Sequence, residues 1–250
     1  MNALRAVRLL LLLCTATHGT AWSAELPSPA PPTKGTRTIY LVRHGAYDEA
    51  DTRDDAVGRG LVPIGVAQAR LLGGRLRGLP VRFAAALASP LTRARETAAV
   101  LADDLGLVVE NVPDLSECTP PTRRQDIMAR EKPEDLAACS AQLQRLAGRL
   151  LHPSEGSDRH ELVVAHGNVI RWLTVTALDV DPAAWLVMSI GHASLSVITI
   201  PADGAPRVLA VGDVGHLPPG LQTGAVGMSP RTLAVPAPAP PPARADPPGH

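Results

Sequence analysis

The sequence predicts an α/β fold, a three-layer sandwich in which helices cover both faces of a mostly parallel central sheet. Short apolar runs typical of buried strands alternate with longer segments whose apolar residues recur at helical spacing. This alternation extends over residues 37–223, an ordinary length for one domain. Because 45% of the whole chain is hydrophobic, such a domain can bury a substantial core.

The first half of the pattern begins with residues 38–42 (TIYLV), whose β-branched and aromatic side chains favour a buried strand. Pro63 then suits the first turn of a helix, where no N–H donor is needed, and the apolar residues after it share one helix face. A second apolar run, residues 84–88, precedes a helix over residues 91–105, in which apolar residues are three and four apart. Residues 107–109 are a third strand candidate.

The second half repeats the alternation. Residues 136–150 have apolar side chains three and four apart, which predicts another helix. Residues 162–165 (LVVA) are typical of a buried strand, and the helix expected after it covers residues 169–177. Residues 194–200 and 207–211 are the last two strand candidates, and an Asp-Gly pair between them predicts a hairpin turn.

The flanks of this domain are rich in proline and lack the alternation. Residues 25–36 are a Pro-rich stretch, which favours an extended linker. Residues 224–250 are a Pro/Ala-rich segment, which we expect to be a disordered tail. The expected folded domain is therefore residues 37–223.

Residues 1–24 have the three regions of a secretory signal peptide. Arg5 and Arg8 precede an apolar run over residues 9–14, and small residues follow that run. The run is too short to span a bilayer, so we expect no membrane span in the mature chain. An uncleaved N-terminal anchor is the alternative. The pattern predicts an exported protein, located in the bacterial periplasm or secreted.

Charge and composition exclude some classes of partner. The chain has 24 basic and 24 acidic residues, whereas nucleic-acid-binding proteins usually have a basic surplus. Only 2% of the residues are aromatic, so surfaces on which bases could stack are hard to build. We expect no nucleic-acid partner.

Two histidines follow directly on expected central strands. His44, within Arg43-His44-Gly45, follows the strand at residues 38–42, and His166 follows the strand at residues 162–165. Ligands of open α/β sheets bind at the carboxyl ends of the strands. Asn168 could cap the helix that begins there, where an anion would meet the positive end of the helix dipole. A lone histidine is more often structural, but two at equivalent strand ends favour an anion site.

A third segment, residues 89–98 (SPLTRARETA), also joins a strand end to a helix start. Arg93 lies in the first turn of that helix, off its apolar positions. Judged alone, Arg93 is typical of a solvated surface arginine.

Together these segments resemble the histidine phosphatase superfamily, the phosphoglycerate mutase-like group. The blocks that carry the resemblance are LVRHG at residues 41–45, LVPIGVAQARLLG at 61–73, SPLTRARETA at 89–98 and VVAHGNVIR at 163–171. Val62 departs from the threonine usual at the start of the second block. Looser similarities at residues 114–117 and 212–219 resemble the mitochondrial serine/threonine protein phosphatases of that superfamily.

The resemblance implies a phosphomonoester hydrolase that works through a phosphohistidine on His44. Arg43, Arg93 and His166 would bind the phosphate, His166 would also take part in catalysis, and Glu117 would be the general acid and base. It implies no cofactor and no metal. His44, His166 and Glu117 could also be metal ligands, but the adjacent arginines would repel a cation and the spacing matches no metal motif.

Several alternatives stay open on the sequence. The phosphorylated substrate is a phosphoserine or phosphothreonine protein, or else a small molecule such as a sugar phosphate. A non-catalytic phosphate-binding protein is the reading from another class. Cys118 and Cys139 could form a disulfide in an exported protein, but Cys139 also lies at an apolar helix position typical of a core residue. The oligomeric state is not set by the sequence.

Overall fold

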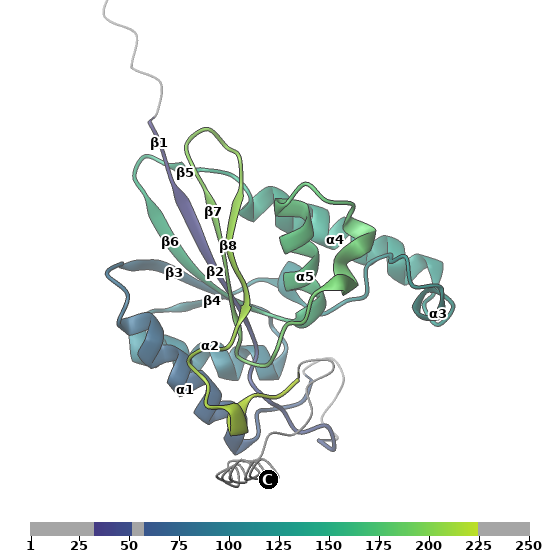
Figure 1. The fold of residues 1–250 in the computed structure, drawn as a ribbon, viewed down its shortest axis with the longest axis horizontal. Coiled ribbons are helices and arrows are strands. Elements are labelled where there is room, and N and C mark those ends of the chain that lie inside the picture. Colours follow the sequence, from purple (N-terminus) through teal and green to yellow (C-terminus); the bar gives the residue numbers. More distant parts are fainter. Residues whose placement is uncertain (1–32, 52–57, 225–250) are drawn as a thin grey trace, which may run out of the picture. The chain divides into compact units, whose positions relative to one another are not determined.

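The computed structural model describes residues 33–51 and 58–224 (Figure 1). The expected signal peptide lies outside the described residues, as do residues 25–32 of the expected linker and 225–250 of the expected tail. None of the helices within residues 33–51 and 58–224 is long and apolar enough to cross a membrane.

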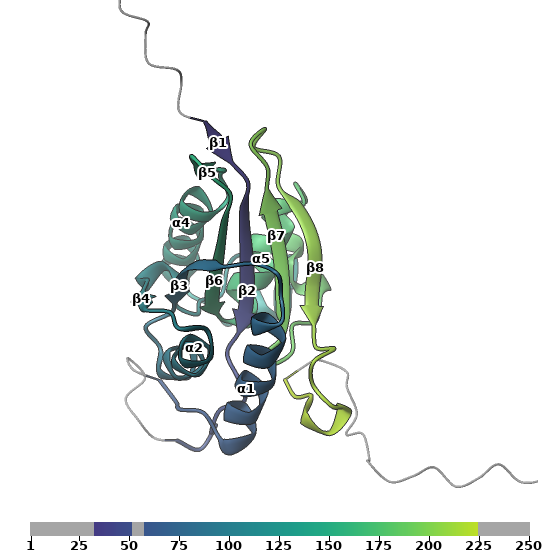
Figure 2. The same ribbon diagram turned by 90° about the vertical axis from the view of Figure 1, so that its left-hand side faces the viewer.

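A six-stranded sheet forms the centre of the fold, with strand order β4-β3-β6-β2-β7-β8 (Figure 2). The four strands from β4 to β2 are parallel, whereas β7 and β8 join as antiparallel strands at one edge. This confirms the mostly parallel sheet. The strands of the sheet are β2 (Arg37–Arg43), β3 (Phe83–Ala88), β4 (Val109–Asn111), β6 (Arg159–Ala165), β7 (Leu195–Ile200) and β8 (Arg207–Asp213).

Helices cover both faces of the sheet, as expected (Figure 1). The α-helices are α1 (Pro63–Arg77), α2 (Thr92–Leu105), α3 (Gln125–Met128), α4 (Pro133–Leu150) and α5 (Gly167–Ala177). Because side chains of a strand alternate between faces, Tyr40 and Val42 of β2 pack with α1 and α2, whereas Ile39 and Leu41 pack with α4 and α5. Each face therefore has its own hydrophobic core.

The structure adds short elements that the sequence pattern does not predict. They are β1 (Lys34–Gly35), β5 (Ser154–Glu155), α3 and the 3₁₀ turns η1 (Pro113–Leu115), η2 (Pro182–Val187) and η3 (Pro219–Leu221). β1 pairs with β5, so residues expected in the linker take part in the fold. α1 begins at Pro63 as predicted, and Val62 before it offers no side-chain cap.

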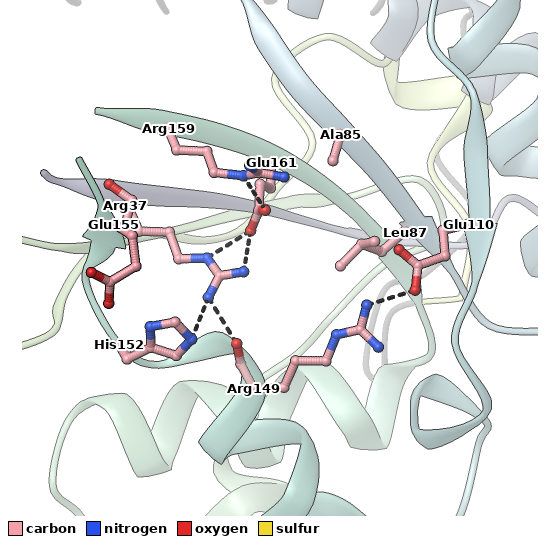
Figure 3. Close-up of a pocket in the computed structure, with 10 residues that line it drawn as sticks. Arg37, Ala85, Leu87, Glu110, Arg149, His152, Glu155, Arg159 and Glu161 are labelled. Atoms are coloured by element: carbon pink, nitrogen blue, oxygen red, sulfur yellow. Dashed lines mark hydrogen bonds and ion pairs between the residues drawn. The ribbon is translucent and has the colours of Figure 1, made fainter. Parts of the chain in front are cut away.

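A buried ion pair lies at the amino-terminal ends of β2 and β6, in a pocket of about 300 Å³ (Figure 3). Arg37 donates through Nε and Nη2 to Glu161 at 2.6 Å, and through Nη1 to the carbonyl oxygen of Arg149 at 2.7 Å. Glu161, which is 2% exposed, also accepts from Arg159. Because these charges satisfy one another, we assign this pocket a structural role.

Candidate active site

The two predicted histidines meet at the carboxyl edge of the sheet. β2 and β6 are adjacent and parallel, and Arg43 is in register with Ala165. His44 and His166 are the next residues of the two strands, and their ring centroids lie 5.1 Å apart. Strand register therefore brings together side chains that are far apart in the sequence.

His44 is only 2% exposed, and both of its ring nitrogens have partners. Nδ1 lies 2.8 Å from the carbonyl oxygen of Gly45, which can only accept, so Nδ1 carries the proton. Nε2 then has a lone pair, and Arg93 Nε donates to it at 3.2 Å. These contacts place the nucleophilic electron pair of the imidazole on Nε2, next to a guanidinium.

The surroundings of His44 keep it neutral. Burial lowers the pKa of His44 well below its ordinary value, and the neighbouring His166, Arg43 and Arg93 lower it further. Glycine is required after it, because a Cβ on Gly45 would lie 2.6 Å from a backbone oxygen of α1. The close approach of α1 contributes to the dry environment of the imidazole.

Two arginines converge on the histidines from different elements. Arg93 reaches His44 from the first turn of α2 and lies over the ring of Tyr47, 5.1 Å from its centroid. Arg43 is anchored through Nη1, which donates to the carbonyl oxygens of Ile190 at 2.6 Å and Gly224 at 2.7 Å. Its Nε is buried and has no hydrogen-bond partner among the described residues. Arg93 is thus not the surface arginine that its position alone indicates.

His166 is fully buried, with Nε2 2.8 Å from the hydroxyl of Ser89. Its Nδ1 has no hydrogen-bond partner within residues 33–51 and 58–224 and lies 3.9 Å from Glu117 Oε2. Burial, Arg93 and Arg43 lower the pKa of His166 well below its ordinary value. Its helix does not have the expected cap, because the Asn168 side chain donates to the carbonyl oxygen of Cys118 instead of capping α5.

Glu117 reaches the same site from the segment after η1. Burial raises the pKa of Glu117 to about 7, although Arg93 and Arg43 favour its ionised form. The next residue, Cys118, forms a disulfide with Cys139 of α4, which resolves the open question of their pairing. The structure therefore brings all five predicted site residues together: Arg43, His44, Arg93, Glu117 and His166.

Other residues of the site escaped the sequence analysis. The ring of His192 lies 5.4 Å from that of His44, and the ring of Tyr47 lies 5.3 Å from it. Both come from loops without a recognisable motif, so only the tertiary fold reveals them. Arg171 lies in a block that the family resemblance covers, and its charge acts on Glu117. The HGNVIR sequence could have drawn attention to Arg171, but nothing pointed to the other two.

Within the described ranges, no group of three or more His, Cys, Asp or Glu side chains is placed to hold a metal ion. The side chains that converge on His44 instead include two guanidinium groups, which suit an anion with several oxygens. A neutral imidazole beside these cations can attack such an anion, and a carboxyl with a pKa near 7 can give and take a proton.

Comparison with known proteins gives three kinds of match. The model of the histidine phosphatase superfamily (branch 1) matches residues 39–121 and 120–214. The mitochondrial serine/threonine-protein phosphatase Pgam5 of Caenorhabditis elegans is 37% identical over 191 residues, which are 74% of this chain and 65% of that protein. Pgam5 of Drosophila grimshawi is 35% identical over 211 residues, 81% of this chain and 71% of that protein. The chain thus spans about two thirds of the length of these relatives.

Solved structures show the same fold. Phosphoglycerate mutase from Plasmodium falciparum has a TM-score of 0.52 and 24% identity, covering 74% of this chain and 95% of that one. The alpha-ribazole phosphatase from Shigella flexneri has a TM-score of 0.57 and 20% identity, and the match covers 71% of this chain and 96% of that one. These likenesses confirm the α/β architecture.

The curated relatives correct one expectation. Those from C. elegans, D. grimshawi and Xenopus tropicalis are all named as mitochondrial proteins. The prediction of an exported protein, periplasmic or secreted behind a signal peptide, is therefore wrong. A basic and apolar N-terminus is a short, generic pattern, and it misled the assignment of the compartment.

The family itself does not depend on that N-terminus. The matched residues cover most of the chain and contain both histidines, both arginines and the glutamate of the site. The sequence resemblance, the family model and the shared architecture agree, and the chain belongs to the histidine phosphatase superfamily.

Proposed function

We propose that this chain is a phosphomonoester hydrolase that carries the phosphoryl group transiently on His44. The observation that carries the proposal is the state of His44, a neutral imidazole whose Nε2 lone pair lies beside the Arg93 guanidinium. Membership of the histidine phosphatase superfamily supports the same reaction class. We place the catalytic side chains within residues 37–223, the expected folded domain.

In the first step the substrate phosphate binds to Arg43, Arg93 and His166. His44 Nε2 attacks phosphorus, a P–N bond forms, and the bond from phosphorus to the leaving oxygen breaks. Glu117 gives its proton to that oxygen, because an alkoxide leaves poorly without one. The guanidinium groups stabilise the negative charge on the equatorial phosphoryl oxygens.

In the second step water replaces the leaving group. Glu117, now a carboxylate, takes a proton from the water as its oxygen attacks phosphorus. The P–N bond breaks, inorganic phosphate leaves, and His44 is neutral again. A carboxyl with a pKa of about 7 suits both tasks near neutral pH. His44 Nδ1 keeps its proton throughout and donates it in a hydrogen bond to the carbonyl oxygen of Gly45.

The proposed substrates are phosphoserine or phosphothreonine proteins. Support comes from the 32–37% identity to relatives named as serine/threonine-protein phosphatases. A small phosphorylated metabolite is the alternative within the same chemistry. A comparison of kcat/KM for phosphopeptides and for sugar phosphates decides between the two substrate classes. Contacts between the residues around the site and the leaving group set the ratio of the two kcat/KM values.

Turnover of p-nitrophenyl phosphate tests the proposed reaction. The protein should hydrolyse it in the presence of a metal chelator and be inhibited by vanadate, and His44→Ala should abolish turnover. His160→Ala is the matched control, because His160 lies in β6 at the opposite end of the sheet from His44. Tight phosphate binding without any turnover would instead identify a non-catalytic phosphate-binding protein.

A further inference from the structure

A third histidine lies beside the two that the motifs contain. His192 is on the turn before β7, is 9% exposed, and places its ring centroid 5.4 Å from that of His44 and 5.8 Å from that of Tyr47. Its Nε2 is buried without a hydrogen-bond partner in the described part of the chain. A buried polar atom without a partner beside an anion site requires a physical account.

The hydrogen bonds behind His192 begin at a buried glutamine. Gln68 of α1 is fully buried, and its Oε1 accepts from the backbone N–H of Ala46 at 2.8 Å. That donor fixes the orientation of the amide, so Nε2 is the donor group of Gln68. It donates to the carbonyl oxygen of Leu221 at 2.7 Å and to the hydroxyl oxygen of Thr223 at 2.8 Å.

The hydrogen bond from Gln68 to Thr223 determines which way the hydrogen bond between Thr223 and His192 runs. Because Thr223 Oγ1 accepts from Gln68, its own hydrogen is available to the second partner, His192 Nδ1, at 3.0 Å. Nδ1 is then an acceptor, and the single proton of a neutral imidazole lies on Nε2. His192 thus has the opposite tautomer to His44, whose proton lies on Nδ1.

The backbone of the C-terminal segment fixes the direction of the ring. A Cβ on Gly224 would lie 2.5 Å from His192 Nδ1, so Gly224 closes the Nδ1 side of the ring. The same Gly224 holds Arg43 through its carbonyl oxygen. Burial, with help from Arg43 and Arg93, lowers the pKa of His192 to about 3, so the ring is neutral at physiological pH.

We propose that His192 Nε2–H is a further donor to the transferring phosphoryl group, and that Thr223 and Gln68 are the positioning residues that hold this tautomer. This inference rests on the proposed phosphatase function. A neutral donor adds a hydrogen bond to a phosphoryl oxygen without adding another full charge to those of Arg43 and Arg93 beside His44. Since the ring is oriented before the substrate arrives, no reorganisation is needed during the reaction.

Substitution of His192 tests the role of the donor. In His192→Leu, kcat/KM for p-nitrophenyl phosphate should fall on the order of tenfold to a hundredfold, and vanadate should bind more weakly by a similar factor. His192→Gln should recover most of the activity, because its amide nitrogen reaches the place of Nε2. His160→Leu, a histidine removed at the opposite end of the sheet, is the control and should leave kcat/KM unchanged.

The tautomer of His192 is measured directly by ¹⁵N NMR of the wild-type protein. This measurement does not depend on whether a variant folds. We expect His192 to show a protonated Nε2 and an acceptor Nδ1. Thr223→Val should mix the two tautomers and lower vanadate affinity several-fold, whereas Thr223→Ser should keep the wild-type signals.

Two results would overturn the inference while leaving the proposed function intact. One is an active wild-type enzyme in which His192→Leu has unchanged kcat/KM and vanadate affinity. The other is a wild-type spectrum with the His192 proton on Nδ1. A folded wild-type protein that hydrolyses no phosphomonoester would instead refute the proposed function.

Discussion

The reactivity that we propose for His44 depends on contacts at both of its ring nitrogens. The carbonyl oxygen of Gly45 fixes the proton on Nδ1, and burial among cations keeps the ring neutral, so the lone pair on Nε2 is available at neutral pH. The motif around residue 44 predicted which residue lies at the site. It could not predict the tautomer, because that depends on Arg93 and on the backbone geometry after β2.

Glu117 allows a direct test at the scale of one residue. Burial raises its pKa to about 7, so the protonated acid is present below that pH and is lost above it. The kcat/KM for an alkyl phosphate should therefore fall as the pH rises through about 7. Glu117→Gln should lower this kcat/KM by about a hundredfold or more and remove that limb of the pH profile.

The leaving group provides the internal control for this prediction. Nitrophenolate leaves without a proton, so Glu117→Gln should slow formation of the phosphoenzyme from p-nitrophenyl phosphate much less. Equal losses on both substrates, or an unchanged pH profile in the variant, would remove Glu117 from the acid role.

At the scale of elements, the parallel pairing of β2 with β6 makes the site. Continuous apolar runs predicted these two strands, because a central parallel strand is buried on both faces, and the 3.6-residue period predicted the helices beside them. Other short elements, such as β1 and η2, have neither a clear period nor a continuous apolar run and were missed. His192 was missed for a related reason, because a turn places it beside His44.

The disulfide links the segment of Glu117 to α4. Cys118 follows the glutamate directly, and its partner Cys139 is buried in the helix. Cys139→Ala should lower the free energy of unfolding by about 3 kcal/mol, as expected for a loop of this length. It should also lower kcat/KM for alkyl phosphates more than for p-nitrophenyl phosphate, because the acid that protonates the leaving oxygen is held less firmly.

Chemical reduction provides the matching experiment. Dithiothreitol should reproduce both effects in the wild-type protein and change nothing in Cys139→Ala. If alkyl and aryl phosphates respond equally to loss of the disulfide, the link supports stability alone and does not position Glu117.

At the scale of the molecule, the two ends of the parallel strands have different roles. The carboxyl ends gather charges and polar atoms that lack partners in the described part of the chain, such as Arg43 Nε and His166 Nδ1. The amino-terminal ends hold Arg37 and Glu161, which pair with each other (Figure 3). A formal net charge of zero for the chain therefore conceals a locally cationic site.

Loss of the buried pair should affect stability without affecting chemistry. Arg37→Met should lower the free energy of unfolding by about 3 to 5 kcal/mol, because it leaves Glu161 buried without its main cation. The kcat of the folded variant should be unchanged, since the pair lies at the far end of β2 from His44. Chemical denaturation and steady-state kinetics on the same sample measure both quantities.

Arg159→Met is the matched control from the same pocket. Arg159 also donates to Glu161, but about half of its side chain is exposed, so its loss should cost only about 1 kcal/mol. A fall in kcat for Arg37→Met would show that the two ends of the sheet are coupled.

The central claim is that the phosphoryl group passes through His44, and trapping the intermediate tests it most directly. The enzyme is mixed with p-nitrophenyl phosphate, quenched in base during turnover, and analysed by mass spectrometry of its peptides. We predict phosphate on Nε2 of His44, in a larger amount in Glu117→Gln, where attack by water is slowed. Phosphate on another residue, or rapid turnover with no phosphoenzyme, would contradict the account.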